Sequence, residues 1–169
     1  MNSRTFNATG LALLLVVSLS MVSRAATATA ESDAPLPGPS IDLQPGEIVQ
    51  IVIDALANND QPFADAGIET AFNFSSPTNR ENTGPLDRFV TLVKGPVFGQ
   101  MVKHRDSTLS QVLIEGDKAL CLVQVVDRDN KTAYYAFRLG LQQQGEYAGM
   151  WLTEAVWPLQ NPERDVIAL

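Results

Sequence analysis

The chain has 169 residues, and its 19 acidic side chains outnumber its 12 lysines and arginines, which gives a formal net charge of −7. Such an excess of negative charge repels nucleic acids and anionic lipid surfaces, so a role in binding either is disfavoured. With one histidine and one cysteine, the sequence offers neither a cluster of zinc ligands nor an internal disulfide, and we expect no metal and no cofactor.

The first 30 residues have the features of an export signal. Arg4 supplies a positive charge, residues 11–22 (LALLLVVSLSMV) are apolar apart from two serines, and residues 28–30 (ATA) offer small side chains to a signal peptidase. This apolar run is shorter than the roughly 20 residues that a membrane-spanning helix needs. We therefore predict a cleaved signal, an exported protein that is periplasmic or secreted, and no stable membrane insertion. An uncleaved N-terminal anchor is the alternative.

The rest of the chain has the size of one domain. Cleavage after residue 30 would leave 139 residues with a net charge of −9, because the removed segment holds Arg4 and Arg24 and no acid. Residues 31–44 contain three prolines and little to bury, so we predict a flexible lead-in. We then expect a single domain over residues 45–159 and a C-terminal tail over residues 160–169.

A first helix is predicted over residues 47–58 (EIVQIVIDALAN). Its polar side chains recur at intervals of three, four and four, which makes one narrow polar stripe on an otherwise apolar helix. These side chains are Glu47, Gln50, Asp54 and Asn58. A helix of this kind is largely buried. Asp65 is expected to cap a second, short helix through the run AGIETAFNF.

Residues 72–89 (FNFSSPTNRENTGPLDRF) form a polar run bounded by phenylalanines. The structural interpretation is an ordered loop, in which Phe72, Phe74 and Phe89 are buried in the core. The Asn and Thr side chains would then bond backbone groups that neither helix nor sheet serves.

A functional interpretation of the same run is a binding site. Four of its side chains would rim the mouth of a pocket and bind an anionic or carbonyl-bearing ligand: Asn79, Arg80, Asn82 and Arg88. Arginine suits a carboxylate because its planar guanidinium can bind both oxygens. Arg88 could equally form a plain ion pair with Glu81 or Asp54.

A third helix is predicted to begin after Thr83, which would cap it. Its apolar side chains are three or four residues apart: Leu86, Phe89, Val90 and Val93. The pair Gly95–Pro96 should end it. The following run VFGQMVKH leaves room for one more short turn.

From Ser107 the pattern changes to alternation, which predicts four strands at about 107–114, 118–127, 131–142 and 147–157. The short connections EGD, DRDNK and QQGE make neighbouring strands antiparallel, because a parallel return needs a long crossover. In the third strand, one face carries Ala133, Tyr135, Phe137, Leu139 and Leu141. The second strand is apolar on both faces, as a central strand would be.

Helices followed by an antiparallel meander predict an α+β fold, with N-terminal helices packed on one face of a curved four-stranded sheet. A sheet of this kind twists and curls. If a helix lies in its concavity, the result is a cone whose open end is a natural pocket for a small molecule.

Three stretches of the sequence resemble the signature of a small uncharacterised domain family of plants, algae and bacteria. They are DALANND, GIETAFNFSSPTNRENTGPLDRF and GMWLTEAV, and the likeness covers roughly residues 45–159. Members of this family look like relatives of the nuclear-transport-factor-2-like superfamily, so the resemblance implies the cone fold. It implies no activity.

Two groups are candidates for general acid or base chemistry. Asp54 lies on the polar stripe of a helix that is otherwise buried, where a carboxylate can have a raised pKa, with Tyr134, Tyr135 or Glu154 as partners. The alternative, which we favour, is that this stripe faces water. His104 with Asp106 could form a base and its orienting acid. The charges around His104 favour an exposed loop instead.

Aromatic residues of the last two predicted strands are further candidates for pocket walls. On strict alternation Trp151 and Trp157 share one face, and core packing is the expected role of either. Trp151 lining the pocket is the alternative. Tyr134 shares the more polar strand face with Arg138, and that face could be solvated, line a cavity or form a dimer surface. Cys121, within an apolar strand, is expected to be a buried small hydrophobe.

The sequence therefore favours an exported, non-enzymatic domain that binds a small molecule or a partner protein. A small isomerase, dehydratase or hydrolase that uses Asp54 or His104 as general base is the alternative. A third hypothesis is an assembly role, such as a homodimer formed through the outer face of the sheet.

Overall fold

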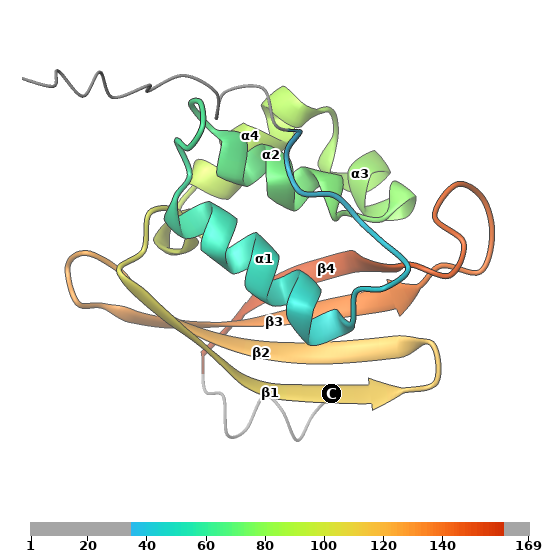
Figure 1. The fold of residues 1–169 in the computed structure, drawn as a ribbon. Coiled ribbons are helices and arrows are strands. Elements are labelled where there is room, and N and C mark those ends of the chain that lie inside the picture. Colours follow the sequence, from blue (N-terminus) through green and yellow to red (C-terminus); the bar gives the residue numbers. More distant parts are fainter. Residues whose placement is uncertain (1–34, 161–169) are drawn as a thin grey trace, which may run out of the picture.

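A computed structural model describes residues 35–160 of the chain. Helices form one layer and an antiparallel sheet the other (Figure 1). The elements are α1 (Pro45–Ala57), α2 (Ala66–Asn73), α3 (Pro77–Thr83), α4 (Leu86–Lys94), the 3₁₀ turn η1 (Gly99–Met101), β1 (Asp106–Glu115), β2 (Lys118–Val126), β3 (Thr132–Leu141) and β4 (Trp151–Leu159). The predicted α+β class is confirmed. The predicted signal segment and nearly all of the predicted tail lie outside the described residues.

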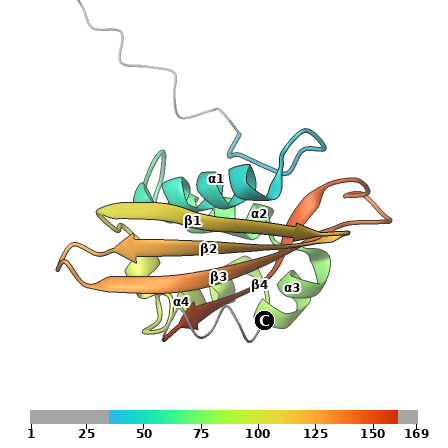
Figure 2. The ribbon, with the colours of Figure 1, turned by 90° about the horizontal axis from the view of Figure 1, so that it is seen from below.

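The sheet is the predicted meander, in the order β1-β2-β3-β4 with every pair antiparallel. All four α-helices lie on one face of it, with α1 above β1 and β2, and with α3 and α4 towards β4 (Figure 2). None of the helices in residues 35–160 combines the length and the apolar character that crossing a bilayer would demand.

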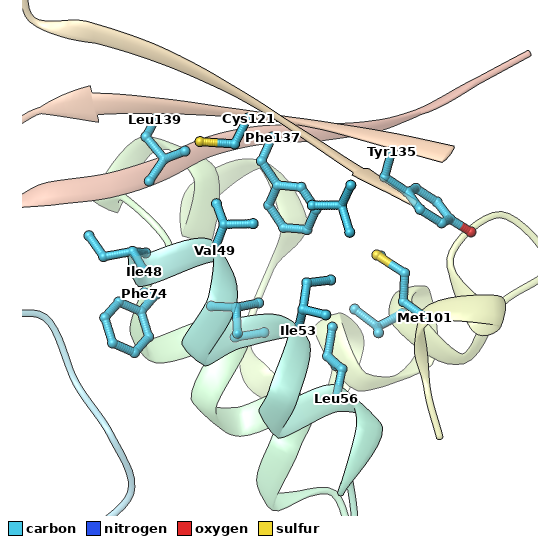
Figure 3. Close-up of a cluster of buried hydrophobic side chains, with 14 of the residues drawn as sticks. Ile48, Val49, Ile53, Leu56, Phe74, Met101, Cys121, Tyr135, Phe137 and Leu139 are labelled. Atoms are coloured by element: carbon cyan, nitrogen blue, oxygen red, sulfur yellow. The ribbon is translucent and has the colours of Figure 1, made fainter. Parts of the chain in front are cut away.

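The first helix has the predicted orientation. Its polar stripe faces solvent, and its buried side chains include Ile48, Val49, Ile53 and Leu56. They point towards Cys121, Phe137 and Leu139 on the strands (Figure 3). Burial raises the pKa of the Cys121 thiol to about 11, so this cysteine is the buried, unreactive residue that its sequence context indicates.

The connection between α1 and α2 is built on one buried amide. Asn59 Nδ2 donates to Asp60 Oδ1 at 2.9 Å and to Asp65 Oδ1 at 2.8 Å, while Asn59 Oδ1 accepts from the backbone N–H of Ile68 at 3.1 Å. Asp65 also receives Lys94 Nζ at 2.6 Å, which lowers the pKa of this carboxyl. The sequence predicts that Asp65 caps α2, but its side chain is engaged in these bonds and makes no capping hydrogen bond.

The polar run that the sequence predicted as a loop contains a helix, α3. Ser76 Oγ accepts from the backbone N–H of Asn79 at 3.1 Å, and Pro77 occupies the first turn. Both are helix-start signals. Thr83 ends α3 and bonds the Asn79 carbonyl oxygen at 2.8 Å instead of capping the next helix, whose N-cap is Pro85.

A bulge in β4 corrects the predicted arrangement of the tryptophans. Arg138 pairs with Ala155 but its neighbour Leu139 pairs with Thr153, so Glu154 is an extra residue in the strand. One extra residue reverses the alternation of faces beyond it. Trp151 consequently packs in the main core under the helices, while Trp157 packs in a small cluster on the opposite face of the sheet.

Candidate functional site

A small cavity lies between the helices and the β3–β4 side of the sheet, and its volume is about 90 Å³. Most of its wall is apolar. Val52 and Leu56 of α1 form one side, Phe89 and Val93 of α4 another, and Phe137 of β3 contributes to the sheet side. Leu92 is 41% exposed, more than any other lining residue, and from this we infer that the cavity opens to solvent beside it.

Four neutral polar residues line the same cavity: Ser75, Asn79, Thr83 and Thr153. The Ser75 hydroxyl donates to the Ala71 carbonyl oxygen at 3.1 Å, and the Thr83 hydroxyl is already bonded within α3. Asn79 Nδ2 donates to the Thr153 carbonyl oxygen at 3.2 Å. Because a carbonyl oxygen only accepts, this bond fixes the Asn79 amide with Nδ2 towards β4, and its Oδ1 accepts from no donor among residues 35–160.

The Thr153 hydroxyl is the second available group. Thr153 is buried, and in residues 35–160 no bond of its hydroxyl to another group is seen. Among the described residues, every side-chain oxygen that is fully buried has a hydrogen-bond partner. Because the Thr153 hydroxyl has none, it must be partly accessible, and the cavity that Thr153 lines accounts for this accessible surface. The Ser75 and Thr83 hydroxyls have already donated their protons and can only accept, so among the lining side chains the Thr153 hydroxyl is the one with an uncommitted O–H, and Asn79 Oδ1 is an additional acceptor.

Backbone pairing holds these groups in place. The Thr153 N–H donates to the Phe74 carbonyl oxygen at 2.8 Å, and the Ser76 N–H donates to the Thr153 carbonyl oxygen at 2.9 Å. The segment just before α3 is thus added to the edge of β4 as a short parallel bridge. Since Ser76 also caps α3, the start of this helix and Asn79 are fixed relative to Thr153.

Comparison with known proteins assigns most of the chain to one domain family. The family model described as "Domain of unknown function (DUF4864)" matches residues 44–166. The chain belongs to this family. The matched region contains all of α1–β4 of the DUF4864 domain, and so the whole cavity. The comparison with curated proteins gave no match, and neither did the comparison with solved structures.

Of the six ligand-binding candidates in the DUF4864 domain, Asn79 lines the cavity. Arg80 instead closes the end of α2, because Nε donates to the Phe72 carbonyl oxygen at 3.1 Å and an Nη donates to that of Asn73 at 2.7 Å. Its guanidinium carbon also lies 5.1 Å from the ring centre of Phe72 and 5.6 Å from that of Tyr147. All these contacts hold local structure together.

The other four candidates lie elsewhere. The side chains of Asn82 and Arg88 are exposed, Tyr134 packs in the small cluster on the far face of the sheet, and Trp151 is part of the main core. No ion pair of Arg88 with another described residue is seen, so neither Glu81 nor Asp54 pairs with it. Thr153 was not among the sequence candidates.

Neither candidate base lines the cavity of the DUF4864 domain. Asp54 faces solvent and accepts from Gln50 Nε2 at 2.8 Å. The prediction that His104 lies in an exposed loop is wrong, because this residue is buried and only 6% exposed. Its Nδ1 lies 2.8 Å from the Met101 carbonyl oxygen and therefore carries the proton, and this bond turns the imidazole back onto η1. Asp106 is exposed and bonds the backbone N–H of Ser107.

Proposed function

We propose that the domain binds a small uncharged molecule in the cavity between α3, α4 and the sheet. The observation that carries the proposal is the pair of available polar groups, the Asn79 Oδ1 acceptor and the Thr153 hydroxyl, in a mostly apolar wall. Such a wall with a few placed polar groups is typical of small-molecule sites. No charged residue lines the cavity, so a charged ligand group would be buried without a partner, which is costly.

The size of the cavity restricts the ligand further. A buried cavity of ~150 Å³ accepts benzene. A volume of about 90 Å³ therefore takes a short alkyl or small cyclic group, with any larger remainder lying at the opening beside Leu92. The favoured ligand has an apolar end that carries a hydroxyl or amide. Its N–H or O–H would donate to Asn79 Oδ1, and its oxygen would accept from Thr153.

We further infer that the protein is exported and that its fold is related to the nuclear-transport-factor-2-like cone. Export is supported by the charge, the apolar run and the small residues of positions 1–30. The relationship is supported by helices that precede an antiparallel meander and cover one face of it. A general-base enzyme is less well supported, since Asp54 and His104 both lie away from the cavity.

Binding can be tested by titrating the isotope-labelled protein with matched pairs of compounds, observed by NMR. 1-Butanol and butyramide, whose alkyl chains suit a cavity of this size, are the uncharged probes, while butyrate and butylamine are the charged ones. We expect the uncharged probes to shift the amide signals of Asn79 and Thr153 and to raise the melting temperature, because a ligand that binds only the folded state stabilises it. The charged probes should do neither.

Two variants locate the site. Thr153→Val removes the hydroxyl at nearly constant shape and should weaken the binding of 1-butanol about tenfold, a typical effect of one lost hydrogen bond. Val93→Phe should fill the cavity and abolish binding. Arg88→Ala is the control and should change nothing. A preference for butyrate, or signal shifts away from the cavity, would contradict the proposal.

A further inference from the structure

The two edges of the sheet are built differently. At the β4 edge, Phe74 and Ser76 bond the backbone of Thr153, Pro158 lacks an N–H, and the bulge at Glu154 twists the strand. Each of these features hinders the addition of another strand. β1 has no strand beside it other than β2 among residues 35–160, and it forms the open edge in Figure 2.

The end of β1 lacks the usual protection of an edge strand. Between Asp106 and Glu115 the strand has no charged residue and no proline. After a bulge at Ser110, three consecutive apolar residues are exposed: Val112 (39%), Leu113 (46%) and Ile114 (54%). A long apolar edge of this kind is a template for pairing with another strand.

The direction of the backbone groups on this edge follows from the register. Just before β2, the Asp117 carbonyl oxygen accepts from the Leu141 N–H, so the backbone groups of Asp117 point towards β3. Because these directions alternate along a strand, the odd-numbered residues of β2 also bond to β3, and its even-numbered residues bond to β1. Leu113 is opposite Leu120 and therefore bonds to β2. By the same alternation, Val112 and Ile114 direct their N–H and C=O groups away from the sheet.

The side chains of this segment are complementary to themselves. Val112 and Ile114 are opposite Cys121 and Ala119 and lie on the helix-covered face, while Leu113 lies on the other face. In an antiparallel pair centred on Leu113, Val112 faces Ile114 of a second copy and Leu113 faces its own counterpart. Gln111 then faces Glu115, so its amide can donate to the carboxylate, and no two like charges meet.

We propose that β1 of two copies pair antiparallel around Leu113, which joins two four-stranded sheets into one continuous sheet in a two-fold homodimer. Val112 and Ile114 exchange backbone hydrogen bonds across the axis. The interface is small, so the dimer is weak and forms at high protein concentration. It is also favoured by added salt, which screens the repulsion between two acidic copies. It is independent of the ligand proposed above.

Disulfide trapping in the mature full-length protein tests the register. In the proposed pair the two Leu113 residues face each other at a non-hydrogen-bonded position, where Cα atoms are ~4.5 Å apart, within the range of a disulfide. Leu113→Cys should therefore give a covalent dimer on mild oxidation. Glu115→Cys is the matched control and should not, because it faces Gln111 of the other copy. The native Cys121 is fully buried and does not interfere.

Sedimentation velocity tests the association without a cross-link. Ile114→Pro removes an N–H that points away from β2, so the strand keeps its internal bonds while the dimer is lost. Gln111→Lys should strengthen the dimer by facing Glu115, and Ile41→Lys, at an exposed apolar residue elsewhere, should leave it unchanged. A protein that stays monomeric at high concentration and salt would overturn the proposal. So would a dimer that survives Ile114→Pro, or equal trapping by both cysteine variants.

Discussion

The helical layer has two halves that differ in how closely they pack on the sheet. α1 covers the β1–β2 side with side chains that are fully buried, among them Ile48 and Val49. On the β4 side, α3 buries none of its residues and α4 buries only Phe89 and Val93. The cavity lies in this second half. The filled half therefore contributes most of the buried contacts, while the looser half contains the space and the polar groups on which the proposed ligand binding rests.

The largest expected effect is a difference in unfolding free energy between matched truncations in the two halves. Ile53→Ala, in the filled half, removes a fully buried side chain and should lower the free energy of unfolding by about 2–5 kcal/mol. Leu92→Ala, at the cavity opening, should cost less than ~1 kcal/mol because Leu92 is already partly in water. Urea denaturation of both variants, with unchanged m-values, measures the difference. Equal losses would mean that the cavity half is as tightly packed as the other.

A second variant disrupts the connection between α1 and α2, which is held by the buried amide of Asn59. Asn59→Ala leaves the buried N–H of Ile68 without its acceptor and removes two bonds to Asp60 and Asp65, so we expect a loss of about 2–3 kcal/mol. Asn82→Ala, at an exposed amide of α3, is the control and should stay within ~0.5 kcal/mol of the parent. If Asn59→Ala is also neutral in urea denaturation, the amide is not the structural centre of this connection.

The smallest expected effect is a loss of stability at high pH that comes from the buried Cys121 of the filled half. The pKa of Cys121 is raised from 9.0 to about 11, so the folded state holds its proton more tightly than the unfolded state. Stability is fully present below pH ~9 and falls as the pH rises towards 11; by pH 10 the loss is about 1 kcal/mol. Urea denaturation between pH 8 and pH 10 measures it, and Cys121→Ala should lose this part of the pH dependence.

A thiol placed in the cavity gives the matching comparison. Thr153→Cys should react with a small maleimide in the folded protein, because the Thr153 side chain borders the cavity, whereas Cys121 should react only on unfolding. Equal protection of both thiols would show that the cavity is closed to small molecules.

Local patterns in the sequence determined much of the fold. The polar stripe of α1, the alternating faces of β3 and the first two strand connections each depend on neighbouring residues alone, and each was predicted correctly. The third connection is longer than the predicted QQGE, because β4 begins at Trp151 and not near residue 147. For α3 the start signal was local as well. Ser76 followed by Pro77 was present in the sequence, but the polar run lacks an apolar stripe, because this helix buries none of its residues.

The site depended on tertiary structure. Asn79 was among the candidates, yet its partner Thr153 is far from it in the sequence, and the two meet only because the segment before α3 pairs with the edge of β4. The face of Trp157 was decided by the extra residue Glu154, whose carboxylate lies over Gly140 where a Cβ would clash. By itself the sequence determined the four strands, the helices α1, α2 and α4, their order and the buried face of α1, since periodicity is a local property. Only the packed chain decided which polar groups meet, because that depends on register and on contacts between distant residues.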